Sequence, residues 1–485
     1  MSNSAPAIVW FREDLRLADN PALTAAVKTG RPLVLLYIHD EESSGLRARG
    51  GASKWWLGKS LAEHARRIEK AGGRLTIRVG AAKDVLNDVI VETGATAVFW
   101  NRRYGGPERA LDADLKTSLK QDNMDVSTFN GRLLTEPWDI TTGAGTPYKV
   151  FTPYWKAMKA AYRAPDALPA PKSLSGPDIE SVTLDSLGLH PTNPDWSDGL
   201  EETWSPGEAG AMDRLSDFLE GPINTYSKDR NRPDLEDGTS RLSPHLHFGE
   251  ISPAQVWRAV QHGINADRFD ESSAMTFLSE LVWREFSYVL LYYNPDLATE
   301  NYNSDFDALP WRKDSDAVKA WSEGQTGYPI VDAGMRQLWH TGYMHNRVRM
   351  IVASFLTKHL LQPWQVGEDW FWDTLVDADQ AANPASWQWT AGSGADAAPY
   401  FRVFNPITQG QKFDPNGAYV RRWCPELSDL PDKFLHTPWE AGSDTLKAAG
   451  ITLGKTYPKP IVDHPTARQR ALDAYDTLKE KRNAA

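Results

Sequence analysis

The sequence predicts an α/β domain followed by an all-α domain, and three observations carry this prediction. Short apolar runs alternate with longer amphipathic ones over residues 8–130, as in a doubly wound parallel sheet. A segment rich in Pro, Ser and Asp comes next, and helical periodicity then continues to the last residues. A chain of 485 residues suits two or three domains. We expect an α/β domain at 1–135, a linker at 136–205 and a helical domain at 206–485.

The expected sheet is built from five apolar runs that read as strands buried on both faces. They are residues 8–11, 33–38, 75–79, 97–100 and 126–129, with helices such as 55–70 and 82–92 between them. Sheets of this kind bind ligands at the carboxyl ends of their strands.

The first of these runs leads into FREDLRLADN, which lacks the G-x-G-x-x-G turn of dinucleotide-binding folds, so ordinary nicotinamide binding is not expected. A formal match at residues 392–397 has no strand before it and is interpreted as a coincidence or a turn between helices.

The linker and the helical region follow from composition and from helix-start signals. Residues 165–204 combine Pro, Ser and Asp, which is typical of a long surface connection. Ser243-Pro244 and Ser252-Pro253 are helix starts in which a serine caps and a proline occupies the first turn. Residues 467–482 predict a final amphipathic helix, and no disordered tail is expected after it.

Composition limits the function classes. The net charge is −11, yet residues 165–221 hold 12 acidic and 2 basic residues, so the rest of the chain sums to −1 and leaves room for a basic groove. Cys424 is the single cysteine, which excludes an internal disulfide and argues against a zinc site, so we expect no metal. No apolar run approaches the roughly 20 residues that span a bilayer, and the N-terminus lacks a signal-peptide pattern, so a cytoplasmic, non-membrane protein is expected.

Residues 238–249, GTSRLSPHLHFG, combine hydroxyl groups, a guanidinium and a helix start. Such a set suits a phosphate or pyrophosphate, although an ordinary capped turn has the same residues. His245 and His247 have no further ligand cluster beside them and are interpreted as structural.

Residues 277–293, FLSELVWREFSYVLLYY, predict an apolar helix that carries charged residues. Glu280 and Arg284 are four apart, which is compatible with a surface salt bridge. Trp283 lies at the edge of the apolar face, where it packs in the core or lines a cavity.

The stretch 327–405 places polar side chains densely among apolar ones. Buried charges need partners, so this region holds an internal salt network or surrounds a polar ligand, and we favour the ligand. Arg349 and Asp377 could hold a polar heteroaromatic ring by its edge, and Asp379 and Asn383, four apart, are expected to share a helix face. No Ser-His-Asp or Cys-His arrangement is evident, which favours chemistry carried by a cofactor.

Taken together, five motifs make the chain similar to the photolyase and cryptochrome family of flavoproteins, most closely to microbial cyclobutane pyrimidine dimer (CPD) photolyases, with class III as the suggested class. They are IVWFREDLRLADNPAL, GTSRLSP, ELVWREF, GYPIVDAGMRQLWHTGYMHNRVRM and DADQAANPASWQWTAGSGADAAPYFRVFNPITQGQKFD. The resemblance covers nearly the whole chain. It implies an N-terminal antenna domain of Rossmann-like fold and a helical domain that binds FAD and the DNA lesion.

The resemblance also implies which residues hold a U-shaped FAD. The phosphates and adjoining groups would be held by Tyr226, Thr239, Ser240, Arg241, Leu242 and Ser243. The flavin ring and its surroundings would be met by Phe277, Glu280, Arg284, Arg349, Asp377, Asp379 and Asn383. An arginine beside the ring would favour an anionic reduced flavin. Asn383 is neutral where the plant photoreceptors of the family carry an acid.

The activity implied is light-driven repair of pyrimidine dimers in UV-damaged DNA, by electron transfer from photoexcited reduced FAD to a flipped-out lesion. Trp283 and Trp389 match the tryptophans that flank the lesion, and Glu280 and Asn346 match its hydrogen-bonding residues. Met350 matches the methionine of CPD photolyases. The related (6-4) photolyases use a histidine pair here, which MHNRVRM lacks.

Two further residue sets come from the resemblance. The candidates for DNA phosphate contacts are Arg230, Arg232, Arg347 and Arg402, which as a group predict binding that weakens steeply with salt. The candidates for a chain that carries electrons from the surface to the flavin are Trp387, Trp364 and Trp311. On spacing alone most of the 20 tryptophans would be core residues.

The expected antenna is 5,10-methenyltetrahydrofolate, with 8-hydroxy-deazaflavin as the alternative. Glu108 falls at the place of the folate-binding glutamate of the first domain. The Cys-Lys pair of that site is replaced by Ala298-Thr299, which indicates a folate held differently, as in class III photolyases.

Two other functions remain as alternatives. A cryptochrome, a blue-light receptor that signals through partners, is disfavoured by Trp283, Trp389, Met350 and Asn383 and by the expected lack of a C-terminal extension. A flavin or nicotinamide oxidoreductase acting in the dark is disfavoured by the missing fingerprint. We expect a monomer that needs no protein partner.

Overall fold

The computed structural model describes residues 5–397 and 401–484 of the chain, which divides into two compact units. Unit 1 comprises Met1–Asn224 and Ser240–Pro295, and unit 2 comprises Thr225–Thr239 and Asp296–Ala485. Part of the helical region that follows the linker therefore packs with the sheet. The domain bounds 1–135, 136–205 and 206–485 group residues by sequence pattern and stay a prediction.

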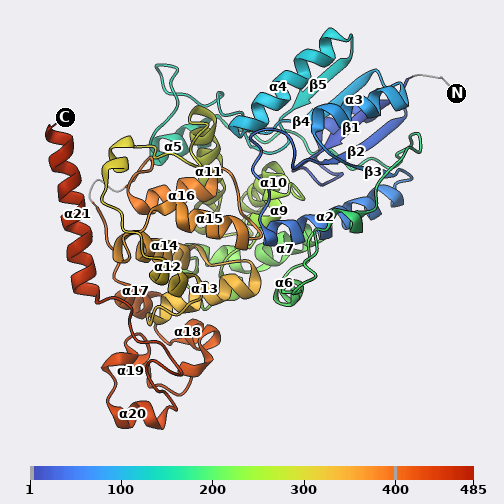
Figure 1. The fold of residues 1–485 in the computed structure, drawn as a ribbon. Coiled ribbons are helices and arrows are strands. Elements are labelled where there is room, and N and C mark those ends of the chain that lie inside the picture. The colour runs from blue at the N-terminus through green and yellow to red at the C-terminus, as the bar shows by residue number, and fades with distance from the viewer. Residues whose placement is uncertain (1–4, 398–400, 485) are drawn as a thin grey trace. The chain divides into compact units, whose positions relative to one another are not determined.

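Unit 1 contains the predicted parallel sheet, coloured blue to cyan in Figure 1. Its five strands pair in the order β3-β2-β1-β4-β5, all parallel. The strands are β1 (Ala7–Phe11), β2 (Leu33–His39), β3 (Leu75–Val79), β4 (Ala97–Asn101) and β5 (Asp125–Phe129). The helices between them are α1 (Pro21–Lys28), α2 (Gly51–Lys70), α3 (Ala82–Thr93) and α4 (Gly106–Gln121). The strand order reverses between β1 and β4, so the doubly wound fold predicted from the sequence is confirmed.

Alternate residues of the strands face opposite sides of this sheet. Trp10 and Trp100, for example, pack in one cluster with Leu86 of α3 and Leu115 of α4. On the opposite face Phe11 contacts His64 of α2, with ring centroids 4.6 Å apart. Helices therefore cover both faces, which explains why the strands appear in the sequence as continuous apolar runs.

The predicted linker is tied to the edge of the sheet. The backbone N–H of Leu33, in β2 ahead of its first residue paired with β3, donates to the carbonyl of Ser175, and that of Val182 donates to Ile77 of the edge strand β3. These bonds satisfy backbone groups that an exposed edge would present to other chains.

The other helices of unit 1 are α5 (Phe151–Ala161), α6 (Asp198–Thr203), α7 (Glu208–Glu220), α9 (Ser243–His247), α10 (Pro253–Asn265) and α11 (Glu271–Tyr293). Ser252 caps α10, as predicted, and the structure adds a complete capping box with Gln255. Helix α9 begins at Ser243 itself, so Leu242 rather than Ser243 occupies the N-cap position. The prediction of a serine cap was wrong there because the chain reaches helical geometry one residue earlier.

Unit 2 is helical. Its helices are α8 (Tyr226–Asp229), α12 (Ser315–Ser322), α13 (Pro329–Thr341), α14 (Asn346–Ser354), α15 (Trp364–Thr374), α16 (Ala382–Ala391), α17 (Pro406–Phe413), α18 (Ala418–Trp423), α19 (Asp432–Leu435), α20 (Ser443–Ala448) and α21 (His464–Ala484). A π-helical turn, Phe355–His359, continues α14. Outside the sheet of unit 1, the described residues form only two isolated β-bridges, so the predicted all-α character of this region is confirmed.

Within the part of the chain that the structure describes, none of the helices is both long enough and apolar enough to span a bilayer.

Candidate active site

Arg349 and Asp377 form the predicted charge pair of unit 2. Nη2 of Arg349 donates to both carboxylate oxygens of Asp377, at 3.0 and 2.9 Å, and Nε donates to the carbonyl of Met344 at 2.7 Å. The Asp377 side chain is 4% exposed and that of Arg349 is 24% exposed. The pair therefore holds a fixed guanidinium whose remaining donor edge is available to a polar ligand.

Asp379 and Asn383 are buried at the start of α16. The expectation that they share a helix face was wrong. Asp379 lies before the helix, and its Oδ1 accepts the N–H groups of Ala381 and Ala382 at 2.9 and 2.8 Å. Asn383 lies in the first turn, and its amide donates to the Glu368 side chain at 2.8 Å. Asp379 sits in the preceding turn because a carboxylate there satisfies N–H groups that a helix start leaves without partners.

The candidate lesion residues of unit 2 lie on two helices that pack together. Asn346 and Met350 are four residues apart on α14, so they share one of its faces, and α14 packs against α16, which carries Trp389. Asn346 is exposed, while Met350 and Trp389 are half-buried. The indole N–H of Trp389 donates to the carbonyl of Asp396 at 3.0 Å, which fixes the ring.

The glycine-rich match after Trp389 is a turn. Helix α16 ends at Ala391, Gly392 adopts a φ of +99°, and the N–H of Gly394 donates to Gln388 of the last turn. This supports the interpretation of residues 392–397 as a helix end rather than a dinucleotide fingerprint.

The three tryptophans of the predicted electron-transfer chain differ in exposure. Trp364 and Trp387 are buried, at 0% and 2%, whereas Trp311 is half-buried. The indole N–H of Trp364 donates to Asn301 at 2.8 Å, and the Trp387 ring contacts Phe371, with centroids 5.0 Å apart. Their role in electron transfer stays a prediction.

The candidate phosphate-binding arginines of unit 2 differ in the kind of group that they contact. Arg232 pairs with Asp234, at 2.7 and 2.5 Å, so its charge is already matched. Arg347 instead donates to the amide oxygen of Asn231, at 3.2 and 2.7 Å. Arg230 lies over the ring of Tyr226 and Arg402 over that of Phe404, with guanidinium-to-centroid distances of 5.6 and 5.3 Å.

His345 caps α14 and is held neutral. Its Nδ1 accepts the N–H of Arg347 at 3.1 Å, so the ring proton of the neutral form lies on Nε2. Burial and the nearby charges of Arg347 and Arg349 lower the pKa of His345 to about 3. An imidazolium in this position would add a third cation to the start of α14.

The turn that precedes α9 carries the candidate phosphate-binding hydroxyls. Within unit 1, Ser240 Oγ accepts the N–H of Leu242 at 3.4 Å, and Arg241 adopts a left-handed backbone with a φ of +52°. The guanidinium of Arg241 lies 4.5 Å from the ring centroid of Trp204, which directs its charge toward that ring. Of the predicted unit 2 members, Tyr226 opens α8 and is buried, and Thr239 follows a short 3₁₀ turn.

Helix α11 buries the charged residues that the sequence placed on it. Arg284 donates to the carbonyl of Arg132 at 2.9 Å and to Glu285 at 3.1 Å. Because its side chain is only 12% exposed, Arg284 does not lie in a surface salt bridge. Burial raises the pKa of Glu285 to about 7 despite the neighbouring Arg284.

The aromatic residues of α11 pack against other helices of unit 1. Trp283 stacks on Phe151, with ring centroids 3.7 Å apart and an interplanar angle of 9°. Phe277 packs on Phe218 at 4.6 Å. The other α11 candidate, Glu280, is half-buried in the turn that follows Phe277.

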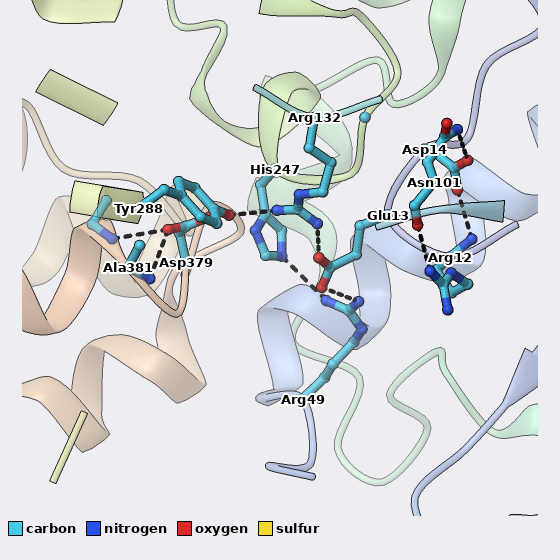
Figure 2. A network of polar contacts seen from close by, with 12 residues as sticks. Arg12, Glu13, Asp14, Arg49, Asn101, Arg132, His247, Tyr288, Asp379 and Ala381 are labelled. Atoms are coloured by element: carbon cyan, nitrogen blue, oxygen red, sulfur yellow. Dashed lines mark hydrogen bonds and ion pairs between the residues drawn. The ribbon is translucent and has the colours of Figure 1, made fainter. Parts of the chain in front are cut away.

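A polar network lies at the carboxyl ends of β1 and β4, the place where the fold predicts a ligand (Figure 2). Arg12 and Arg103 both pair with Asp112 of α4, at 3.1 and 2.9 Å. Asn101 donates to Asp14 at 2.6 Å. Arg12 also lies over the ring of Trp10, 4.2 Å from its centroid.

Glu13 extends this network toward the helices of unit 1. Figure 2 shows it between Arg49 and Arg132, with Arg49 donating at 2.9 Å and Arg132 forming a second ion pair. Glu108, in the first turn of α4, is buried, and its charge acts on Arg49. These side chains give unit 1 a buried polar region of both signs.

The histidines of the predicted phosphate turn have structural partners. His245 hydrogen-bonds to Glu250, which also accepts the indole N–H of Trp56 at 2.9 Å. His247 contacts Arg49 at 3.1 Å. In residues 5–397 and 401–484 no group of three or more His, Cys, Asp or Glu side chains is placed to hold a metal ion.

Several residues at these sites were missed by the sequence reasoning: Glu285, Glu368 and Asn231. Glu285 directly follows Arg284 and offered a signal, since an acid next to an arginine in an apolar helix needs a partner. Glu368 and Asn231 offered none, because their partners lie 15 and 116 residues away along the chain.

The family models that match the chain are "DNA photolyase" over residues 7–172 and "FAD binding domain of DNA photolyase" over residues 277–477. A deoxyribodipyrimidine photo-lyase of Agrobacterium fabrum is 52% identical, with 98% of this chain and 99% of that protein aligned. Cryptochrome-1 of Arabidopsis thaliana is 39% identical, with 97% of this chain and 70% of that protein aligned. The crystal structure of a bacterial class III photolyase from Agrobacterium tumefaciens superposes with a TM-score of 0.96 at 52% identity, over 99% of both chains.

Proposed function

Since the chain belongs to the DNA photolyase family, we propose that it is a deoxyribodipyrimidine photo-lyase that repairs cyclobutane pyrimidine dimers under light. The observation that carries this proposal is the 52% identity to a photo-lyase over nearly the whole of both chains. Identity to Cryptochrome-1 is lower, at 39%. The predicted residues of CPD repair, Asn346, Met350 and Trp389, support the same function from the sequence.

The residues present fit FAD as the cofactor. A flavin ring offers carbonyl oxygens and N–H groups at its edge, and Arg349 and Asp377 present donors and acceptors held together by the two bonds from Nη2 of Arg349 to the Asp377 carboxylate. Asn383, held by Glu368, adds a neutral amide rather than an acid. When bound, reduced FAD excited by light supplies the electron that splits the dimer.

The proposed FAD ligands are those predicted from the sequence. For the phosphates and adjoining groups they are Tyr226, Thr239, Ser240, Arg241, Leu242 and Ser243. For the ring and its surroundings they are Phe277, Glu280, Arg284, Arg349, Asp377, Asp379 and Asn383. Backbone N–H groups and hydroxyls would stabilise the pyrophosphate by hydrogen bonds, while Arg284 and Arg349 would stabilise negative charge on the ring.

The chain's own residues would bind and orient the lesion. A flipped dimer is unstacked from its neighbours, so the aromatic faces of Trp283 and Trp389 would replace the lost stacking. Glu280 and Asn346 would hydrogen-bond the base edges, and Met350 would pack against them with its polarizable thioether. Of the candidate arginines, Arg230, Arg347 and Arg402 are proposed to hold phosphates; Arg232 is left out because Asp234 already matches its charge.

A single assay separates repair from the alternatives. The purified protein, with its flavin reduced, is mixed with an oligonucleotide that carries one thymine dimer, and dimer loss is followed under blue light and in darkness. Repair in light alone is expected. No dimer loss, together with light-driven reduction of a second sample whose flavin starts oxidised, would indicate a cryptochrome. Loss of a (6-4) lesion from a second oligonucleotide, with the thymine dimer left intact, would indicate the other class of photolyase.

We also propose that unit 1 holds 5,10-methenyltetrahydrofolate as the antenna, near Glu108. The buried charges of both signs around Glu108, Arg49 and Arg103 could meet the amide and carboxylate groups of a folate. Chromophore release by denaturation, followed by chromatography and absorption spectra, tests this proposal. Recovery of 8-hydroxy-deazaflavin, or of a second flavin per chain, would replace it.

For the solution state we propose a monomer that acts in the cytoplasm without a protein partner. The mass from light scattering should be that of one chain, and with lesion DNA it should be that of one chain plus one duplex. A mass of two chains would overturn the monomer, and a signal from the membrane fraction in cell fractionation would overturn the location.

A further inference from the structure

Among the described residues, the contacts that hold the side chain of Arg347, on the first turn of α14, are with neutral groups. Its Nε and Nη2 donate to Asn231 Oδ1 at 3.2 and 2.7 Å, and its Nη1 contacts Met350 Sδ at 3.6 Å. The guanidinium carbon lies 4.5 Å from the ring centroid of Phe413. The side chain is thus oriented on several sides while its charge is not cancelled.

Arg232, which follows Asn231 in the sequence, shows how a carboxylate partner differs from an amide partner. It makes the same kind of two-point contact, but with the carboxylate of Asp234, at 2.7 and 2.5 Å. An amide oxygen orients a guanidinium as a carboxylate does, yet leaves its full positive charge. Asn231 therefore orients Arg347 and leaves its positive charge in place, whereas an aspartate at this position would also cancel the charge.

Other cations act on the same guanidinium. Burial and the charges of Arg230 and Arg402 lower the pKa of Arg347. Like charges that are held near one another are destabilising unless an anion joins them. A DNA phosphate is an anion of the geometry that a planar guanidinium binds.

We propose that Asn231 is a positioning residue for DNA binding: it holds Arg347 in a fixed direction, with its charge intact, for a phosphate of the lesion-bearing strand. This inference rests on the proposed function, because it takes damaged DNA as the ligand. Asn231 itself does not contact the phosphate. It removes the ordering cost that a free arginine side chain would incur on binding, which corresponds to roughly 2- to 12-fold in Kd.

The test uses the flavin-loaded full chain and a duplex oligonucleotide with one thymine dimer, with Kd measured in darkness from 50 to 200 mM KCl. Asn231→Ala should raise Kd by roughly 2- to 12-fold at every salt concentration. Asn231→Asp should pair with Arg347 and remove one phosphate contact. The ratio of Kd at 200 mM to Kd at 50 mM should then fall by about 3.5-fold, since one contact contributes a slope of about 0.9.

A double-mutant comparison shows whether Asn231 acts through Arg347. In the Arg347→Ala background, Asn231→Ala should add no further loss, because the group that it orients is gone. Gln325→Glu adds the same charge at an exposed position of unit 2 and should leave the slope unchanged. Flavin absorbance confirms that each variant keeps its cofactor and fold.

Two results would overturn the inference: an undiminished effect of Asn231→Ala in the Arg347→Ala background, or a wild-type salt slope for Asn231→Asp. Light-driven repair by the wild-type protein, measured in parallel, keeps the two proposals apart. Repair together with either result rejects only the role of Asn231. A wild-type protein that neither prefers the dimer nor repairs it rejects the proposed function, and the role of Asn231 with it.

Discussion

Glu285 is a buried carboxylate whose ionisation is finely balanced. It is 2% exposed, it accepts the backbone N–H of Leu134 at 2.7 Å, and it contacts Arg284 at 3.1 Å. Burial disfavours its charged form more than these partners favour it, which raises its pKa to about 7. Because Arg284 is a proposed flavin ligand, the charge state of Glu285 sets how much of the Arg284 charge remains for the cofactor.

The raised pKa predicts a pH-dependent contribution to stability. The unfolded value is 4.5, so between pH 4.5 and 7 the folded chain binds the proton more tightly, and the stability from this group falls as the pH rises through that window. In Glu285→Gln this contribution is absent. The variant's free energy of unfolding, relative to wild type, should therefore increase by about 3 kcal/mol from pH 4.5 to pH 8.

Urea unfolding at pH 4.5, 6.5 and 8 measures this difference. Glu271→Gln, at the exposed start of α11, is the matched control and should show no such trend. A difference between Glu285→Gln and wild type that stays constant with pH would contradict the raised pKa.

Trp389 carries a second prediction at the residue scale. If its ring stacks on the flipped lesion, Trp389→Ala should lose roughly 1–3 kcal/mol, or about 5- to 150-fold in Kd for dimer-containing DNA. FAD content should stay at one per chain. Trp339→Ala, which removes a surface tryptophan that is 59% exposed, should leave lesion binding unchanged. Loss of the flavin from Trp389→Ala would show instead that the ring is scaffold.

Among the elements, α13 depends on a buried carboxylate in its first turn. Asp332 accepts the N–H and hydroxyl of Thr326, both at 2.6 Å, the N–H of Gly327 at 3.0 Å and the hydroxyl of Tyr457 at 2.7 Å. A carboxylate is an acceptor only, so it satisfies all four donors, and it lies at the positive end of the helix. The start of α13 is thereby joined to the loop before it and to a distant residue near the C-terminus.

Replacement of this carboxylate by an amide should therefore be costly. In Asp332→Asn one acceptor becomes a donor that faces other donors, and the expected loss in free energy of unfolding is about 2–4 kcal/mol. Thermal and urea unfolding measure it. Asp316→Asn, at an exposed site in the first turn of α12, should change stability by less than about 0.5 kcal/mol. Equal effects of the two variants would contradict the role given to Asp332.

For the whole molecule, the distribution of charge matters more than its sum. The net charge is −11, and the stretch 165–221 contributes −10 of it. Unit 2 holds Arg230, Arg347 and Arg402, whose mutual influence is visible in the lowered pKa of Arg347. An acidic protein can therefore bind DNA where its acids lie elsewhere along the chain.

Three phosphate contacts predict a definite dependence on salt. A plot of log K against log salt for a dimer-containing duplex should have a slope of about −2.7, that is, about −0.9 for each contact. Arg347→Ala should make the slope shallower by about 0.9, whereas Lys433→Ala, at an exposed site, should not change it. A slope near zero for the wild-type protein would contradict the proposed arginine contacts.

Much of the fold could be predicted because local patterns determine it. The apolar runs around Ile8, Leu36 and Val98 are buried on both faces, and the observed strands contain all five predicted segments. The sequence predicted the kind of site, a set of polar side chains with partners, because dense polar residues in an apolar region need them. Arg349 does pair with Asp377. The position of Asp379 was not predictable from its spacing to Asn383, because capping competes with helical extension at a helix start.

The sequence by itself determined the α/β and helical regions, the family and the residues that are candidates for FAD, lesion and DNA binding. Only the tertiary structure decided the charge state and the partner of each ionisable group. Asp234 neutralises Arg232, whereas Asn231 orients Arg347 without neutralising it. Burial raises the pKa of Glu285 to about 7. The physical reason is that ionisation and ion pairing depend on burial and on partners brought together by packing. Asn231 and Arg347, 116 residues apart, have no local pattern that connects them.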